Sequence, residues 1–222
     1  MRIDVISCLP NFAELAVGFS MMSIAVKKEI INFHCHDLRN YSHNKHKKID
    51  DYQYGGGAGM VMMIEPLVNC IEDIQKKTDC KDIVYMAPDG DILSQKISNH
   101  YSQKKSIIII CGHYKGIDDR VREHFVTQEI SIGKYVVSGG ELPAAVFIDS
   151  FVRLIPGVLS DQNSALEDSF QNDGLVAPPC YTRPENFRGM EVPKILLSGN
   201  HEEIKKWRYY QSVKRTEKNN FS

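Results

Sequence analysis

Residues 106–118 read SIIIICGHYKGID. The unbroken run from Ile107 to Ile110 is typical of a strand buried on both faces, as in a parallel sheet. The run leads into a loop whose two glycines, Gly112 and Gly116, let the backbone approach a ligand closely. Open α/β sheets bind ligands at the carboxyl ends of their strands. An ordinary turn between a strand and a helix would look the same, so the loop alone does not establish a site.

The segments around this stretch alternate between predicted strands and predicted helices. Apolar patterning predicts further strands at residues 3–7, 30–36, 82–87 and 126–131. It predicts helices at residues 65–77, 92–104, 118–124 and 142–155, the last apolar nearly all round and therefore deeply buried. We expect a turn at residues 88–91 and a polar loop at residues 42–51. This repetition predicts an α/β fold with a mostly parallel sheet.

A second glycine-containing loop, residues 131–143 (SIGKYVVSGGELP), also lies between a predicted strand and a predicted helix. Its glycines, aromatic side chain and apolar side chains suit a flat purine and a thioether better than a triphosphate. Neither loop has the spacing of a phosphate-binding loop or of a dinucleotide-binding fingerprint, so nucleotide hydrolysis and nicotinamide chemistry are disfavoured. Ser138 and Glu141 have the spacing of a capping box for the next helix.

Length, charge and cysteine usage describe an ordinary cytoplasmic protein. The chain has 222 residues, a net charge of -1 and six cysteines without a C-x-x-C pair. Reduced thiols fit this pattern better than disulfides. No apolar run is long enough to span a bilayer, and Met1–Asp4 does not begin a secretory signal. We therefore expect a cytoplasmic location and no membrane association.

Several polar residues outside the loops could carry chemistry, although each has a structural alternative. Arg153 could hold an anion or complement the end of its helix. Asp168 could be catalytic or form a local cap in a solvated loop. Histidines between His34 and His46 match no standard zinc spacing, so no metal ligands are predicted and a solvated or RNA-facing loop is favoured.

A helix predicted from His201 to about Lys218 begins at a second capping box formed by Asn200 and Glu203. Basic and aromatic side chains are interleaved along it, a composition that fits contacts with RNA. A solvated helix face with Trp207 and Ile204 packed inward explains the same pattern.

Several blocks of sequence, in order from residue 54 to residue 208, resemble the bacterial tRNA (guanine-N1)-methyltransferase family, TrmD. They are YGGGAGMVMMIEPL, CGHYKGIDDRV, SIGKYVVSGGELPA, FVRLIPGVL, EDSF, YTRPENFRGMEVPKILLSGNH and IKKWR. The resemblance implies a knotted (deep trefoil) S-adenosylmethionine-binding domain over residues 1–158. It also implies a linker over residues 159–175, a small helical tRNA-binding domain over residues 176–222, and a homodimer with active sites at its interface.

The resemblance also assigns roles to residues. It implies methyl transfer from S-adenosylmethionine to N1 of the guanosine just 3′ of the tRNA anticodon, guanosine 37, a modification that supports reading-frame maintenance. Asp168 would be the general base for the N1 proton, and Arg153 would stabilise the charge that develops on O6. The residues implied to contact the cofactor are Ala87, Pro88, Gly112, Tyr114, Ile132, Gly133, Lys134, Tyr135, Val136, Val137, Gly139, Gly140 and Pro143.

The chain departs from the family pattern at three positions, with His113 in place of the usual arginine, Lys115 in place of glutamate and Ala177 in place of aspartate. These departures leave a Mg²⁺ requirement open. Two alternative functions remain on the same scaffold, a catalytically silent RNA-binding module and a ribose 2′-O-methyltransferase.

Overall fold

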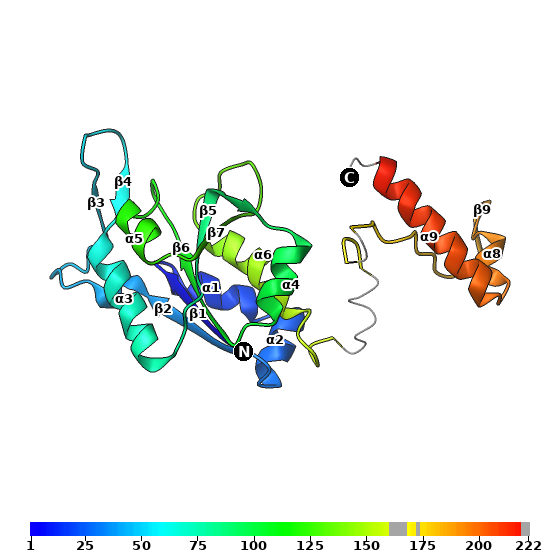
Figure 1. Cartoon of the computed structure of the whole chain (residues 1–222), viewed down its shortest axis with the longest axis horizontal. Coiled ribbons are helices and arrows are strands. Elements are labelled where there is room, and N and C mark those ends of the chain that lie inside the picture. The colour runs from blue at the N-terminus through cyan, green and yellow to red at the C-terminus, as the bar shows by residue number, and fades with distance from the viewer. Residues whose placement is uncertain (160–167, 172–173, 219–222) are drawn as a thin grey trace. The chain divides into compact units, whose positions relative to one another are not determined.

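A sheet of five parallel strands forms the centre of the first part of the chain (Figure 1). The strands are β1 (Arg2–Ser7), β2 (Asn32–Asp37), β5 (Ile83–Ile92), β6 (Ser106–Cys111) and β7 (Gln128–Ser131), in the order β2-β1-β6-β5-β7. The computed structural model describes residues 1–159, 168–171 and 174–218. The chain divides into two compact units, Met1–Ser160 and Asp161–Ser222, and the sheet belongs to the first.

Helices cover both faces of the sheet, which explains the continuous apolar run in β6. Ile107 and Ile109 pack in one core with α1 (Pro10–Val17), α2 (Ser20–Lys27), α4 (Gln95–Ser102) and α6 (Glu141–Val152). Ile108 and Ile110 pack in a second core with α3 (Ile64–Lys77), α5 (Asp119–His124) and the short 3-10 helix η1 (Leu38–Tyr41). Since successive strand residues point to opposite faces, all four isoleucines are fully buried. The predicted α/β fold with a parallel sheet is confirmed.

Three local predictions were wrong. The turn expected at residues 88–91 lies within β5, whose pairing with β7 shifts between Met86 and Asp91. The bare backbone of Gly90 permits this close pairing, because a Cβ there would lie 2.6 Å from the Glu129 carbonyl carbon. The polar loop expected at residues 42–51 ends earlier, since β3 (Asp50–Tyr52) pairs with β4 (Met60–Met62). His34 and His36 lie in β2, which confirms the strand predicted at residues 30–36, and not in the loop favoured for the group of histidines.

Helix α6 also differs from its prediction. Its N-cap is Gly140 and receives no side-chain hydrogen bond, so Ser138 does not form the expected capping box. Glu141 is free to make contacts elsewhere, described below. The helix is not buried all round, because Leu142 is 55% exposed and Val146 is 49% exposed. Helices α1 and α2 were not predicted from the sequence.

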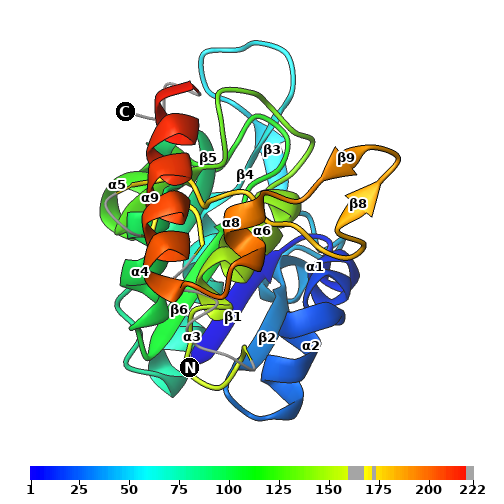
Figure 2. The ribbon, with the colours of Figure 1, turned by 90° about the vertical axis from the view of Figure 1, so that its right-hand side faces the viewer.

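The second unit contains α8 (Lys194–Leu197), α9 (His201–Lys218) and a hairpin of β8 (Asn186–Phe187) and β9 (Met190–Glu191). Figure 2 shows α9 as a long helix beside α8. The backbone N–H of Glu203 donates to the Asn200 side chain at 3.3 Å, which confirms the N-cap half of the predicted capping box. The Asn200 N–H donates to Ser198 Oγ instead of the Glu203 side chain, so the reciprocal half is not formed. Within the described residues, no helix combines the length and apolar composition needed to cross a membrane.

Candidate active site

The two glycine loops meet at the carboxyl ends of β6 and β7 and enclose a cavity of about 450 Å³. One loop follows β6 and begins at Gly112; the other follows β7 and ends at Gly140, where α6 begins. The Gly140 N–H donates to the Gly112 carbonyl at 2.8 Å, which joins the two loops directly. Their meeting at this edge is the arrangement in which open α/β sheets bind ligands.

Two of these glycines are required by close packing. A Cβ on Gly140 would lie 2.6 Å from the Cys111 Cα and 2.8 Å from the Gly112 nitrogen, both backbone atoms that cannot move aside easily. A Cβ on Gly112 would lie 2.8 Å from the Tyr85 ring. The backbone is therefore the wall of the cavity here, and even a methyl group would disrupt it.

Most of the residues predicted to contact the cofactor lie at this cavity, and Lys134 is not among those lining it. The predicted residues in its lining are Ala87, Pro88, Gly112, Tyr114, Ile132, Gly133, Tyr135, Val136, Val137, Gly139, Gly140 and Pro143. Apolar side chains and backbone form much of this surface. That chemistry accommodates a flat ring and a thioether.

Charged side chains that the sequence reasoning missed line the cavity as well. Arg122 of α5 donates to Asp89 at 2.8 Å and to Glu129 at 2.6 and 2.7 Å. Its guanidinium carbon lies 5.6 Å from the centre of the Tyr85 ring. The hydrogen bonds from Arg122 lower the pKa of the Asp89 carboxyl below its ordinary value, so Asp89 remains an acceptor at neutral pH. No sequence motif predicts this cluster, because its three residues come from separate elements. Arg122 lies in α5, Glu129 in β7 and Asp89 in the irregular part of β5.

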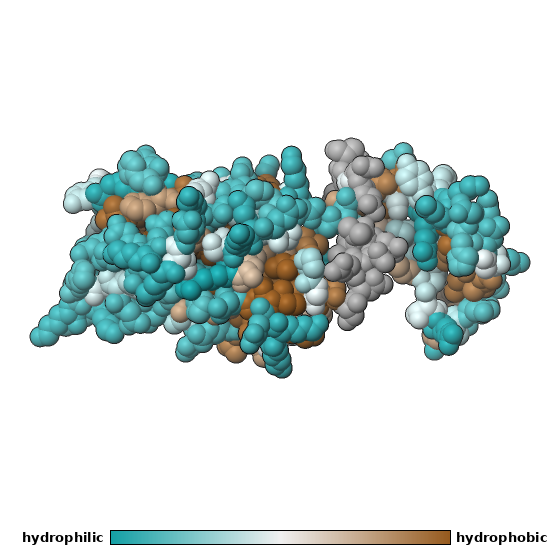
Figure 3. Space-filling view, turned by 60° about the horizontal axis from the view of Figure 1, so that its bottom comes forward, coloured by the Kyte–Doolittle hydropathy of each residue, from teal (hydrophilic) through white to brown (hydrophobic). Residues whose placement is uncertain are grey.

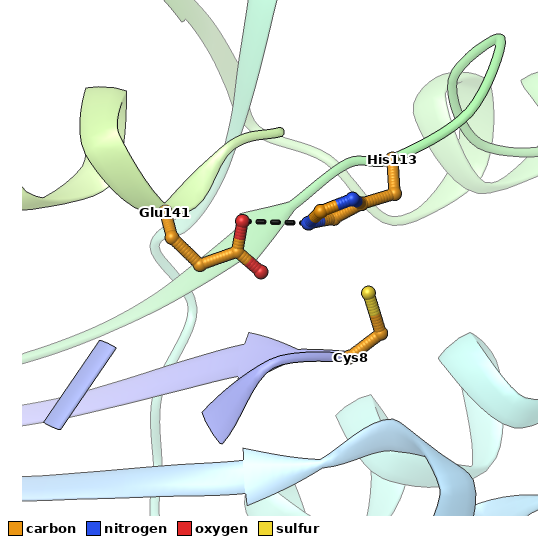
Figure 4. A group of neighbouring side chains, drawn as sticks. All are labelled: Cys8, His113 and Glu141. Atoms are coloured by element: carbon orange, nitrogen blue, oxygen red, sulfur yellow. Dashed lines mark hydrogen bonds and ion pairs between the residues drawn. The ribbon is translucent and has the colours of Figure 1, made fainter. Parts of the chain in front are cut away.

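A buried cluster next to the cavity holds the first residue of α6. The Glu141 carboxylate, 3% exposed, lies 2.6 Å from His113 Nε2 and accepts a hydrogen bond from Ser7 at 2.5 Å. Figure 4 shows the Cys8 sulfur pointing toward this pair from the end of β1. Burial, and after it the Glu141 charge, raises the pKa of the Cys8 thiol to about 11. The cluster therefore ties β1, the β6 loop and α6 together behind the cavity wall.

Comparison with known proteins identifies the family to which the chain belongs. The family model for "tRNA (Guanine-1)-methyltransferase TrmD" matches residues 1–222. The chain belongs to the TrmD family.

Curated relatives agree over nearly their whole lengths, and each is named tRNA (guanine-N(1)-)-methyltransferase. The relative from Christiangramia forsetii is 53% identical over 218 residues, which cover 98% of this chain and 96% of the relative. The relative from Cytophaga hutchinsonii is 54% identical over 216 residues, with 97% and 92% covered. One from Bacteroides fragilis is 50% identical over 216 residues, with 97% and 96% covered.

The two residues expected at the catalytic positions of the TrmD family lie in different units. Arg153 is the C-cap of α6, at the opposite end of that helix from Gly140, and is half-buried. Asp168 belongs to the second unit and is also half-buried. Neither is among the residues that line the cavity. Their catalytic roles therefore remain predictions.

Proposed function

We propose that the chain transfers a methyl group from S-adenosylmethionine to N1 of guanosine 37 in tRNA. The observation that carries the proposal is the cavity formed where the Gly112 and Gly140 backbones meet, in a chain that belongs to the TrmD family. The two glycine loops that the sequence analysis singled out form much of the wall of this cavity.

The cavity fits the proposed methyl donor in size and in chemistry. Its volume of about 450 Å³ lies in the usual range for pockets that hold small molecules. Ile132, Tyr135 and Pro143 offer apolar surface to the adenine and thioether portions. Bare glycine backbone offers hydrogen-bonding groups that side chains would otherwise cover. The bound cofactor supplies an electrophilic methyl group, and the chain's own task is to align it with the base.

The remaining chemistry concerns a proton and a charge. Guanine N1 carries a proton at neutral pH, so its lone pair is not available until a base removes that proton. We assign this step to the Asp168 carboxylate. Charge then spreads onto O6, where the Arg153 guanidinium stabilises it. The target base must leave its stack in the anticodon loop to reach these groups.

A homodimer is part of the proposal, with Asp168 of one subunit completing the site of its partner. Figure 3 shows hydrophobic residues on the surface of the first unit among largely hydrophilic ones. Helices α1 and α6 pack against each other and expose Phe12, Leu15, Leu142 and Val146, which are 43–59% exposed. Exposed apolar side chains of this size on adjacent helices are typical of an interface. Covering them would place α6, with Arg153 at its end, beside a second copy of the chain.

We further propose that residues 1–158 form the knotted cofactor domain and that residues 159–175, most of which lie outside the described residues, are the linker. Residues 176–222 would then contact tRNA. Exposed basic residues along α9, with Tyr209 and Tyr210 65% and 62% exposed, support a role in RNA contact. A cytoplasmic location follows from a tRNA substrate. A Mg²⁺ requirement stays open, because Lys115 stands where the family usually has glutamate.

One experiment tests the reaction and its alternatives together. The purified chain is incubated with a tRNA transcript and labelled S-adenosylmethionine, and the modified atom is mapped. We expect one methyl group at N1 of guanosine 37 and none on a transcript with adenosine at that position. A methyl group on a ribose 2′-oxygen would instead identify a ribose methyltransferase. Cofactor binding without any transfer would identify a silent RNA-binding module.

A further inference from the structure

Cys8, His113 and Glu141 form a cluster to which the proposed methyl-transfer mechanism assigns no role. They come from three distant parts of the sequence: the end of β1, the loop after β6 and the first residue of α6. The Cys8 Sγ, a ring nitrogen of His113 and a carboxylate oxygen of Glu141 all lie within 4.8 Å of one another (Figure 4). Within the described part of the chain, this is the one gathering of three or more such groups.

We propose that these three side chains bind a divalent transition-metal ion of the Zn²⁺ type. A thiolate, an imidazole nitrogen and a carboxylate oxygen are the donors that zinc prefers, at about 2.0–2.3 Å. Tetrahedral ligands at those lengths lie about 3.5 Å apart, so donors within 4.8 Å need only small side-chain movements. Three protein ligands leave one position for water, as in many non-structural zinc sites.

Charge and burial support a cation at this place. Cys8 is 4% exposed and Glu141 is 3% exposed, so a thiolate and a carboxylate would lie together away from water. Two such anions offset the charge of one divalent cation, whereas without the metal the Cys8 thiol, whose pKa is raised to about 11, keeps its proton. Metal binding releases the thiol proton to solvent. His113 Nε2, which donates its proton to the Glu141 carboxylate without the metal, must also lose that proton: a neutral ring transfers it to Nδ1 through solvent, and a charged ring releases it.

The surroundings already provide support for the ligands. The Ser7 hydroxyl donates to Glu141 Oε1 and leaves Oε2, the atom nearest His113, for the metal. The Leu9 N–H donates to the Ser7 oxygen at 2.8 Å and fixes that hydroxyl. The Arg39 guanidinium donates to the Cys8 carbonyl and holds the backbone that carries the thiol. Such outer hydrogen bonds orient ligands in protein metal sites.

A metal here would act on the wall of the cavity. The His113 ring packs against Gly139, where a Cβ would lie 2.4 Å from His113 Nε2. Both residues line the cavity. The ion would therefore fix the junction of the two glycine loops from behind, without needing to touch the substrate.

The test uses the full-length protein stripped of metal and titrated with Co²⁺ and then Zn²⁺. We expect one ion per chain, a thiolate-to-cobalt charge-transfer band and displacement of cobalt by zinc. Cys8→Ser should abolish the band, and Cys180→Ser, which removes an exposed thiol, should leave it unchanged. Ser7→Ala should weaken the affinity by ~10- to 100-fold, the usual effect of losing an outer hydrogen bond.

X-ray absorption on the unmutated zinc-loaded protein keeps the test independent of how the variants fold. It should give one sulfur neighbour at about 2.3 Å together with nitrogen or oxygen neighbours at about 2.0–2.2 Å. The proposal fails if no stoichiometric binding occurs, if only nitrogen and oxygen neighbours are found, or if Cys180→Ser removes the band. In each of those cases the cluster is a buried ion pair beside an inert thiol. Methyl transfer is measured separately, so either proposal can fail alone.

Discussion

The two units of the chain present their side chains in opposite ways. In the first unit, helices cover both faces of the sheet. The cavity wall is backbone, and a hydrogen bond of 2.8 Å from the Gly140 N–H to the Gly112 carbonyl joins its two loops. In the second unit, Ser212 is the one buried residue of α9, and the basic side chains of this helix are exposed together with Tyr209 and Tyr210. The contrast fits the two modes of recognition proposed above. A fixed cavity selects a small molecule by shape, whereas an exposed basic surface attracts a large polyanion by charge.

The largest expected effect tests whether the second unit contributes chemistry as well as RNA contact. Asp168→Ala should reduce turnover by roughly two to four powers of ten, the usual contribution of a general base, and leave cofactor affinity unchanged. Steady-state rates with saturating tRNA and cofactor titrations give the two quantities. Glu217→Gln, which removes an exposed carboxylate of α9, is the control and should retain full turnover. A small loss for Asp168→Ala would restrict the second unit to binding.

The same substitution can show which subunit supplies the base. Asp168→Ala and Gly140→Ala chains, carrying different tags, are co-expressed and the mixed dimer is purified. If Asp168 serves the partner, one site carries both changes and the other carries neither. Activity per dimer should then return towards half that of the unmutated protein. If Asp168 serves its own chain, every site carries one change and no activity returns.

The next effect tests the shape-based half of the contrast. Gly140→Ala should weaken S-adenosylmethionine binding by ~100-fold or more, because the added methyl group meets the Cys111 backbone at 2.6 Å. Gly18→Ala is a matched control, since the two glycines have nearly the same backbone angles, φ -76 and ψ -8 against φ -75 and ψ -7. The new Cβ of the control meets its nearest atom at an ordinary 3.4 Å. Calorimetric titration compares the two, and thermal melting verifies that both fold. Equal affinities would remove Gly140 from the cofactor site.

A smaller effect tests the charge-based half. Replacing Lys205, Lys206 and Lys214 by glutamine should weaken tRNA binding, and more so at low salt than at high salt. Each lost phosphate contact should reduce the slope of log affinity against log salt by about 0.7–0.9. Cofactor affinity should not change. Lys76→Gln, an exposed lysine of α3, is the control for general loss of positive charge. An unchanged slope would locate the RNA surface elsewhere.

The sequence was informative where local composition determines the structure. The isoleucines of β6 specify a buried strand at residues 106–111, and the helical spacing of Leu67, Cys70, Ile71 and Ile74 specifies α3. Local signals misled where a distant partner decides the outcome. Residues 88–91 have the composition of a turn, but they lie within β5, at an irregularity between the pairs that Met86 and Asp91 both make with Ile130 of β7.

The candidate site divides in the same way. Glycine loops are visible in a sequence, so the backbone wall of the cavity was predicted. Contacts between distant side chains are not visible, so the Arg122 cluster and the pairing of Glu141 with His113 were missed. The spacing of Ser138 and Glu141 suggested a helix cap, whereas Glu141 bonds to residues that are remote in sequence. Only the folded sheet brings these groups together.

The smallest expected effect concerns stability and compares buried with exposed charge across the two units. Burial alone would raise the pKa of Asp4, but hydrogen bonds from His36 and Arg2 outweigh it and lower the pKa below its ordinary value. A carboxyl whose pKa is lower when folded stabilises the protein above its unfolded pKa, about 3.9. That stability is lost as the pH falls through the lower, folded pKa. Asp4→Asn should therefore reduce the free energy of unfolding at pH 7 by about 1–3 kcal/mol, and by less below pH 4.

The control for this prediction is Glu203→Gln in the second unit, because the Glu203 carboxylate pairs with Lys206 at the surface. It should change stability little at any pH, since exposed pairs contribute little. Denaturant unfolding at several pH values, followed by a probe in each unit, measures both. A pH-independent loss for Asp4→Asn would mean that packing, and not charge, makes Asp4 important.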